Sequence, residues 1–86
     1  MGWQEVRRAY PHQWLLVQAL EARSEHERRI VEQMSVVDAF PDSPSAMRRY
    51  MVLHRRSPER EFYVLHTDRE APDIHERIYV GPRMRL

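Results

Sequence analysis

The chain has 86 residues, which is enough for one domain and leaves no room for the second core of a multidomain enzyme. With 42% hydrophobic and 31% charged residues, it is too apolar for a disordered tail and is typical of a small globular domain. Its formal net charge of +1 falls short of the strong basic footprint that nucleic-acid binders usually carry.

All 14 basic residues are Arg, and the chain has no Lys and no Asn, which indicates a GC-rich or heat-adapted (thermophile-like) coding bias. Cysteine is absent, which excludes disulfides, thiolate zinc sites and thiol nucleophiles and fits a reducing cytoplasm. No stretch approaches the roughly 18 apolar residues of a membrane span, and residues 1–10 lack a signal-peptide core. We therefore expect a cytoplasmic protein without a membrane partner.

The first predicted element lies in residues 1–13, which we interpret as a short helix or an arm. Trp3, Val6 and Tyr10 recur at helical spacing before Pro11 ends the pattern. Trp3 and Tyr10 lie outside the main apolar pattern and allow two interpretations. They pack against the core of their own chain, or they cover an open sheet face of a neighbouring subunit.

Two apolar runs, residues 14–22 and 30–37, flank the polar segment 23–28 and predict a β-hairpin. In the second run, Ile30, Met34 and Val36 share one parity, so we expect regular alternation with one better-buried face. Because the polar segment contains neither Gly nor Asn, we expect a connection longer than a two-residue turn.

A helix is predicted between Pro41 and Ser57, because Asp42 or Ser43 can cap it and Pro44 suits its first turn. One side carries residues expected to be buried, at helical spacing: Ala46, Met47, Tyr50, Met51, Leu53 and His54. The other side carries Val52 and an Arg-rich face made of Arg48, Arg49, Arg55 and Arg56. This Arg-rich face is either a solvated surface with ion pairs or a contact for the phosphates of a nucleic acid.

Residues 62–67 and 74–80 predict two more strands, joined by a loop over residues 68–73. The expected fold is α+β with two layers, β-β-α-β-β along the chain: an antiparallel four-stranded sheet with one helix on one face. We expect a single domain over residues 14–82 and a tail over residues 83–86. Because one helix covers one face only, the other face is expected to be solvated or to pack on a partner, which favours a homo-oligomer.

The last two strands carry the sharpest cluster of chemical groups. A hairpin centred between residues 70 and 71 places His66 opposite His75 and brings Asp68 and Asp73 near its tip. Two imidazoles and two carboxylates form a donor set that zinc accepts. The alternative is that these aspartates form turns and these histidines are ordinary half-exposed strand residues, and we favour it, expecting neither a metal nor a cofactor.

An enzyme is not expected. The chain has two glycines, too few for a glycine-rich phosphate loop. None of its serines lies in a nucleophile-elbow motif.

Three segments resemble a family of short uncharacterised bacterial proteins. They are Tyr10-Pro11-His12-Gln13-Trp14-Leu15-Leu16-Val17, Ser45-Ala46-Met47-Arg48-Arg49-Tyr50 with Leu53-His54, and Arg60-Glu61-Phe62-Tyr63-Val64-Leu65-His66-Thr67. The likeness spans residues 10–82, and we associate the family with genes beside small retropepsin-like aspartic proteases. The resemblance implies an accessory or antitoxin-like protein that binds a partner protein, and it supplies no catalytic residues.

Two hypotheses about function follow. In the first, the chain is a non-enzymatic protein-interaction module that exposes sheet surface or a strand edge and binds a second copy or another protein there. In the alternative, it is a small nucleic-acid-binding regulator that uses the Arg-rich face of the predicted helix.

Overall fold

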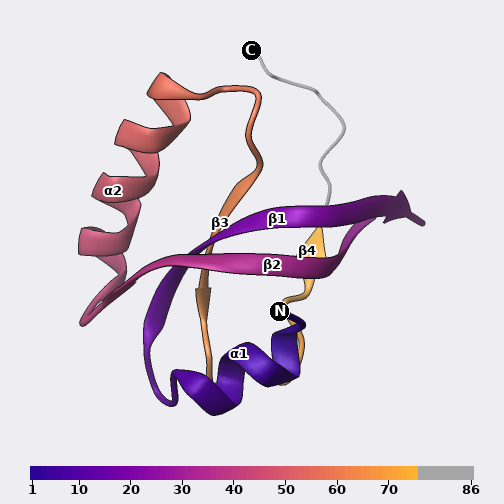
Figure 1. Ribbon diagram of the computed structural model, residues 1–86, viewed down its shortest axis with the longest axis horizontal. Helices are drawn as coiled ribbons and strands as arrows, with labels where there is room; N and C mark the ends of the chain where they lie inside the picture. Colours follow the sequence, from indigo (N-terminus) through magenta and orange to yellow (C-terminus); the bar gives the residue numbers. More distant parts are fainter. Residues whose placement is uncertain (76–86) are drawn as a thin grey trace.

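The computed structural model describes residues 1–75 and has an α+β fold, with two helices and an antiparallel four-stranded sheet (Figure 1). The elements are α1 (Trp3–Ala9), β1 (Trp14–Glu25), β2 (Arg28–Phe40), α2 (Ser43–Arg56), β3 (Phe62–His66) and β4 (Ile74–His75). The predicted last strand over 74–80 is seen only at 74–75; its remainder and the tail 83–86 lie outside the described residues. Neither helix in this part of the chain is a candidate membrane span.

The long hairpin of β1 and β2 confirms the prediction of two paired strands, but the expected long connection was wrong. Only His26 and Glu27 join the strands. Their φ angles are 50° and 63°, the left-handed conformation that a type I′ turn requires at both positions. This turn matches the twist of the flanking strands, so the long ladder imposes it although neither residue favours positive φ.

Three β-bulges interrupt the hairpin, and the extra residues are Leu20, Glu32 and Val37, which have no cross-strand partner. As a result, the core-facing residues of β2 do not follow simple alternation. Those that pack on the core are Val31, Met34, Val36 and Ala39. The regular alternation predicted for this strand was therefore wrong. The bulges also explain why the large apolar side chains of Leu20 and Val37 are exposed.

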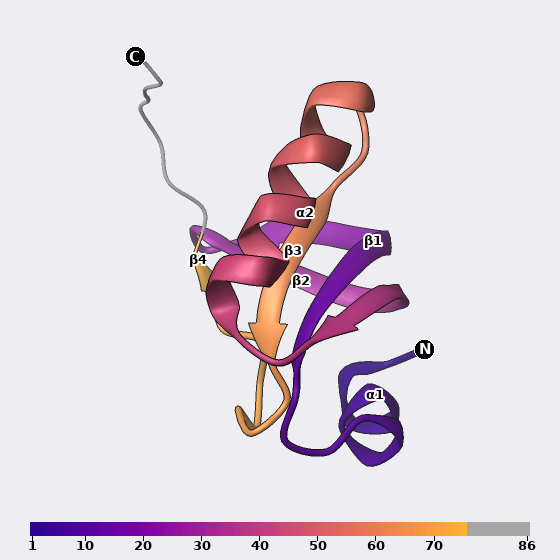
Figure 2. The ribbon, with the colours of Figure 1, turned by 90° about the vertical axis from the view of Figure 1, so that its left-hand side faces the viewer.

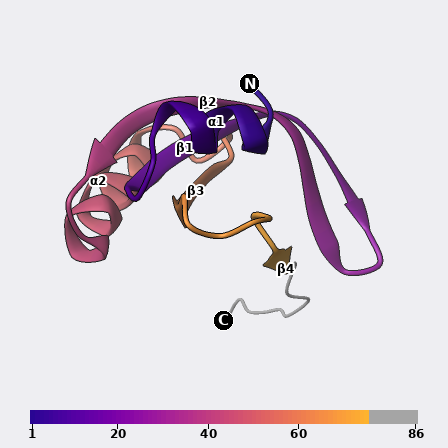
Figure 3. The ribbon, with the colours of Figure 1, turned by 90° about the horizontal axis from the view of Figure 1, so that it is seen from below.

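The strand order is β3-β1-β2-β4, so β3 and β4 lie at opposite edges of the sheet. His66 pairs with Trp14, and His75 pairs with Arg28. The predicted β3–β4 hairpin was therefore wrong: the segment 67–73 runs from one edge to the other across the curved sheet (Figure 3). β3 pairs with β1 because the first half of β1 provides apolar cross-strand partners, as in the pair of Leu15 and Leu65.

Near β3, both faces of the sheet are covered. Leu15 and Leu16 point to opposite faces because they are neighbours on β1, and both are fully buried. On the Leu15 face, Trp3 and Val6 of α1 belong to the core cluster. On the other face, α2 packs on β1 and β3 (Figure 2). The expectation of one helix and an uncovered second face is corrected by α1, which forms the second cover.

The start and end of α2 confirm the sequence prediction. The Asp42 carboxylate accepts a hydrogen bond of 2.8 Å from the Ser45 backbone N–H, which also lowers the pKa of that carboxyl. Pro44 lies in the first turn, and Ser57 caps the C-terminal end. Local capping chemistry thus sets both boundaries of this helix.

Candidate protein-binding surface

The apolar side of α2 is only partly covered by the sheet. Ala46 is fully buried and Tyr50 and Leu53 are half-buried, which is the spacing of a narrow contact strip. Met47 is 42% exposed and Met51 is 58% exposed, so the expectation that both are buried was wrong. The sheet ends at the five-residue strand β3, and the helix side beyond that edge has nothing to pack against within residues 1–75.

A groove runs between α2 and β3 beside these methionines. Its apolar part has a volume of about 260 Å³ and is lined by Met47, Tyr50, Phe62, Tyr63 and Val64. A polar part of about 360 Å³ adjoins it, and three residues line both parts: Tyr50, Phe62 and Tyr63. The second part continues over Pro58, Glu59 and Arg60 before β3. We refer to both parts together as the α2–β3 groove.

The backbone of β3 presents free hydrogen-bonding groups to this groove. Ala19 N–H donates to the Glu61 carbonyl over 2.8 Å, and Thr67 N–H donates to the Gln13 carbonyl over 3.0 Å. In an antiparallel strand, every second residue forms its backbone hydrogen bonds with the same neighbouring strand. Since residues 61 and 67 bond to β1 or to the residues next to it, residues 63 and 65 between them also bond to β1. Phe62 and Val64 therefore direct their N–H and C=O groups to the outer side, where the described sheet has no further strand.

An ion-pair cluster fixes the start of β3. Arg29 of β2 donates to both Glu61 carboxylate oxygens, over 2.7 Å from Nε and 2.9 Å from the second nitrogen, and the Tyr63 hydroxyl donates to the same carboxylate. Hydrogen bonding from Arg29 lowers the pKa of Glu61. Burial, followed by the hydrogen bond to Glu61, raises the pKa of Tyr63. The edge strand thus begins at a rigid, half-buried anchor.

Charged residues lie just beyond both ends of β3. Glu59 and Arg60 precede the strand, are exposed, and form no salt bridge within the described chain. Asp68 and Arg69 follow it and are also exposed. Asp68 lies 2.6 Å from the His12 imidazole, and Arg69 lies 3.8 Å from Asp73. Counted outward from the strand, Arg60 precedes Glu59 at one end and Asp68 precedes Arg69 at the other, so positions equally far from the two ends carry opposite charges.

The Arg-rich face of α2 is exposed, as predicted. None of its four members, Arg48, Arg49, Arg55 and Arg56, forms a salt bridge within residues 1–75. Arg48 donates a hydrogen bond of 3.2 Å to the Ser45 hydroxyl. The face is therefore solvated without direct ion pairs in this part of the chain, although the charge of Arg48 adds to the effect of the Ser45 hydrogen bond in lowering the pKa of the nearby Asp42 carboxylate.

Trp3 and Tyr10 lie against the core of their own chain. Trp3 is 6% exposed, and its Nε1 donates a hydrogen bond of 2.9 Å to the Arg69 carbonyl. Tyr10 is half-buried and packs on the same core. Since α1 folds back onto the sheet, Trp3 is buried in its own chain, and its interpretation as a partner contact is corrected; Tyr10 keeps part of its side chain exposed.

The four residues considered for metal binding lie at two separate places. His66 and Asp68 stand at the β3 edge, 3.8 Å apart, whereas Asp73 and His75 stand at the β4 edge, 3.2 Å apart. Asp73 also contacts Arg28 and Arg69. No group of three or more metal-ligating side chains occurs in the described part of the chain. The predicted cluster fails because it depended on a β3–β4 hairpin that does not form.

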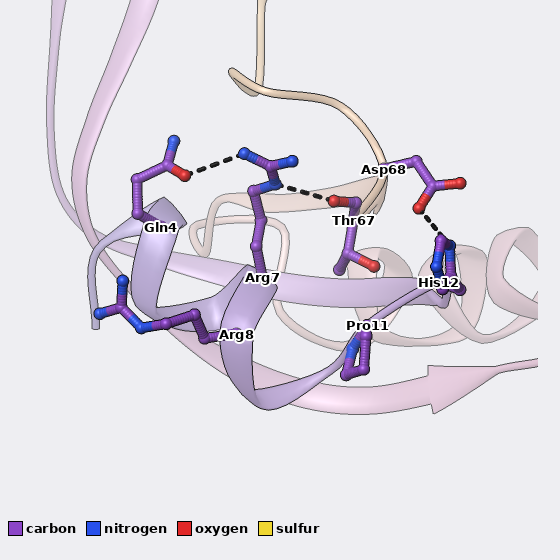
Figure 4. A pocket seen from close by; sticks show the side chains of 7 residues that line it. All are labelled: Gln4, Arg7, Arg8, Pro11, His12, Thr67 and Asp68. Atoms are coloured by element: carbon purple, nitrogen blue, oxygen red, sulfur yellow. Dashed lines mark hydrogen bonds and ion pairs between the residues drawn. The ribbon is translucent and has the colours of Figure 1, made fainter.

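A polar hollow of about 280 Å³ lies where the end of α1 meets the turn after β3 (Figure 4). Arg7 donates from Nε to the Thr67 carbonyl and from a terminal nitrogen to the Gln4 amide oxygen, each over 2.9 Å. His12 pairs with Asp68 across the same hollow. These contacts join α1 to the turn after β3, and so they explain how the helix is held rather than pointing to a ligand.

Sequence patterns missed the α2–β3 groove because its residues have the composition of an ordinary core. Met47 and Met51 have the helical spacing of buried residues, and Phe62 and Val64 have the alternation of a central strand. One signal was present: β3 is short and is followed within two residues by a turn, as edge strands often are. Comparisons with protein-family models, with curated proteins and with solved structures found no match to this chain.

Proposed function

We propose that this chain is a non-enzymatic protein-interaction module that binds another polypeptide by strand addition at the α2–β3 groove. The observation that carries the proposal is the unpaired outer edge of β3 beside an apolar groove. In strand addition, the free backbone groups of an edge strand supply hydrogen bonds, and adjoining pockets receive alternate side chains of the incoming segment. Val64 supplies such backbone groups, and the pocket beside Met47 receives an apolar side chain.

The exposed methionines support the same proposal. Met side chains are unbranched and polarisable, so they adapt to partners of different shape. Met47 lines the groove and Met51 is exposed one turn further along α2, so the helix carries an apolar surface near the free backbone groups of β3, which is the combination that strand addition uses. The accessory role implied by the family resemblance is of the same kind, since it also consists of binding a partner protein.

The proposal is tested by selecting binders from a displayed library of random linear peptides, with the protein immobilised at low density so that copies do not meet. Selected peptides should bind Met47→Asp roughly tenfold to a hundredfold more weakly, because burial of a Met side chain is worth about 1.5–3 kcal/mol. Val64→Pro should also abolish binding, since it removes an outward N–H and leaves the pairing with β1 intact.

The matched control is Val37→Asp, which places the same charge on another exposed apolar residue, on β2, which β1 separates from β3 and the groove. It should leave peptide binding unchanged. Circular dichroism of each variant verifies the fold before binding is compared. Peptides that bind wild type, Met47→Asp and Val64→Pro equally well would show that the groove is not the binding site and would refute the proposal.

A second candidate function rests on the Arg-rich face of α2, whose four exposed guanidinium groups form no direct salt bridge within residues 1–75. Arg48 and Arg55 are two turns apart on one side of the helix, so both can contact one phosphate backbone. If this candidate holds, an RNA or DNA oligonucleotide should be retarded in a gel at low salt, and Arg48→Glu with Arg55→Glu should remove the retardation. No retardation of the wild type would exclude it.

A further inference from the structure

The geometry points to a second copy of this chain as the occupant of the α2–β3 groove, with the β3 strands of two copies paired antiparallel about a two-fold axis at Val64. This inference rests on the proposed function, because it names the partner at the same site. It is a different surface from the one that the sequence suggested for self-association, since Trp3 and Tyr10 are packed in their own core.

The hydrogen-bonding pattern of β3 sets the possible registers. Only the residues that face away from β1 can bond to a strand on the outer side, and these are Phe62 and Val64, followed by His66. A two-fold axis at Val64 pairs this residue with its own copy and pairs Phe62 with residue 66 of the second copy. Every residue of β3 then has a partner, so this register uses the full five-residue strand.

Charges at the strand ends favour this register. Antiparallel pairing about Val64 brings the segment before β3 of one copy beside the segment after β3 of the other. Arg60, directly before the paired residue Glu61, then lies near Asp68 of the second copy, which stands in the turn that follows β3. This contact joins opposite charges and occurs twice by symmetry. Arg60 has no salt bridge within its own described chain, and Asp68, which also lies 2.6 Å from His12, is exposed, so a second cation can approach it.

The apolar side of the interface is self-complementary too. Met47 lines the groove beside Phe62, Tyr63 and Val64, and is therefore close to the proposed axis. A contact near a two-fold axis brings a residue to its own copy, so the two Met47 side chains cover one another's exposed surface. A chain of this size buries a limited share of its surface on folding, and such pairing adds buried apolar area without lengthening the chain.

The experiment measures the dimer dissociation constant by analytical ultracentrifugation over a range of protein concentrations. Arg60→Glu and Asp68→Arg should each weaken the dimer roughly tenfold, since each turns two attractive contacts into repulsive ones. The double variant Arg60→Glu/Asp68→Arg should recover dissociation within a few-fold of wild type. Arg56→Glu, with the same change in charge on the far side of α2, is the control and should dimerise like wild type.

Recovery in the double variant has only an intermolecular explanation. Arg60 and Asp68 lie beyond opposite ends of β3, and that strand alone spans roughly 16 Å, so the two side chains do not meet within one chain. A wild-type monomer at every concentration, or a double variant no better than the single ones, would overturn the inference. A monomer that still binds selected peptides through Val64 and Met47 would leave the proposed function standing and remove the second copy alone.

Discussion

Replacing Trp3 with Ala tests whether α1 is an integral part of the core. Trp3 is 6% exposed, so nearly all of its side chain is removed from water. A buried Trp removes about 150–250 Å² from solvent, which at about 25 cal/mol per Å² corresponds to about 4–6 kcal/mol. Measured Trp→Ala changes in cores cost about 3–5 kcal/mol. A chain of this length has roughly 4–13 kcal/mol of stability in total, so the variant should lose at least about a quarter of it.

The assay is urea denaturation followed by far-ultraviolet circular dichroism. Trp3→Phe keeps most of the packing and loses the hydrogen bond from Nε1 to the Arg69 carbonyl, so it should cost about 1–2 kcal/mol. Leu20→Ala, at an exposed bulge position, is the matched surface control and should change stability by less than about 0.5 kcal/mol. A loss below about 1 kcal/mol for Trp3→Ala would contradict the placement of α1 in the core.

Two further predictions concern the Arg29–Glu61 pair and the hairpin turn. Glu61→Gln should cost about 2 kcal/mol at pH 7, since it removes charge-assisted hydrogen bonds from Arg29. The pKa of Glu61 is lowered in the folded state, so the ionised carboxylate contributes to stability above its unfolded-state pKa, and this contribution is lost as the pH falls through its folded-state pKa. Urea titrations between pH 7 and pH 3 measure this loss. If wild type and variant were equally sensitive to acid, the result would count against the ion pair. Replacing His26 with Asn and Glu27 with Gly should raise stability by about 1 kcal/mol, because both residues have positive φ; a lower thermal midpoint would show that the turn is not of the type I′ geometry.

Local features of the fold could be predicted from the sequence. The cap at Asp42, the proline in the first turn of α2 and the stop at Ser57 depend on neighbouring residues only, so the sequence contains all the information they need. The existence of β1, β2 and β3 follows from apolar alternation and β-branched or aromatic composition in the same way. The helix before Pro11 was one of the two interpretations of residues 1–13, and packing of Trp3 on its own core was one of the two interpretations of that residue.

Features that depend on long-range competition could not be predicted. The apolar surface of β1 around Leu15 decides that β3 pairs with β1 and not with β4. No sequence pattern within residues 62–75 predicts this choice of partner strand. The tight turn at His26 and Glu27 conflicts with local propensity and exists because the strands on both sides impose it.

The candidate site was missed for a related reason. Met47 and Met51 follow the rule for buried helix residues, but exposure depends on where the sheet ends, and that is fixed by the strand order. The Arg-rich face was predicted correctly because a dense run of arginines is exposed under almost any packing arrangement. Sequence alone thus identifies charged surfaces more readily than apolar ones.

The three bulges also make the length of the central hairpin adjustable. Removing one residue from a strand ordinarily turns everything beyond it to the opposite side. Deletion of Leu20, Glu32 or Val37 does not have this effect, because each is the extra residue of a β-bulge. When it is removed, the side chains on both sides of the bulge still point to the same faces of the sheet. Shortening the chain at these positions would straighten the hairpin while preserving its interior, so relatives that differ from this chain by single-residue gaps are expected to have them there.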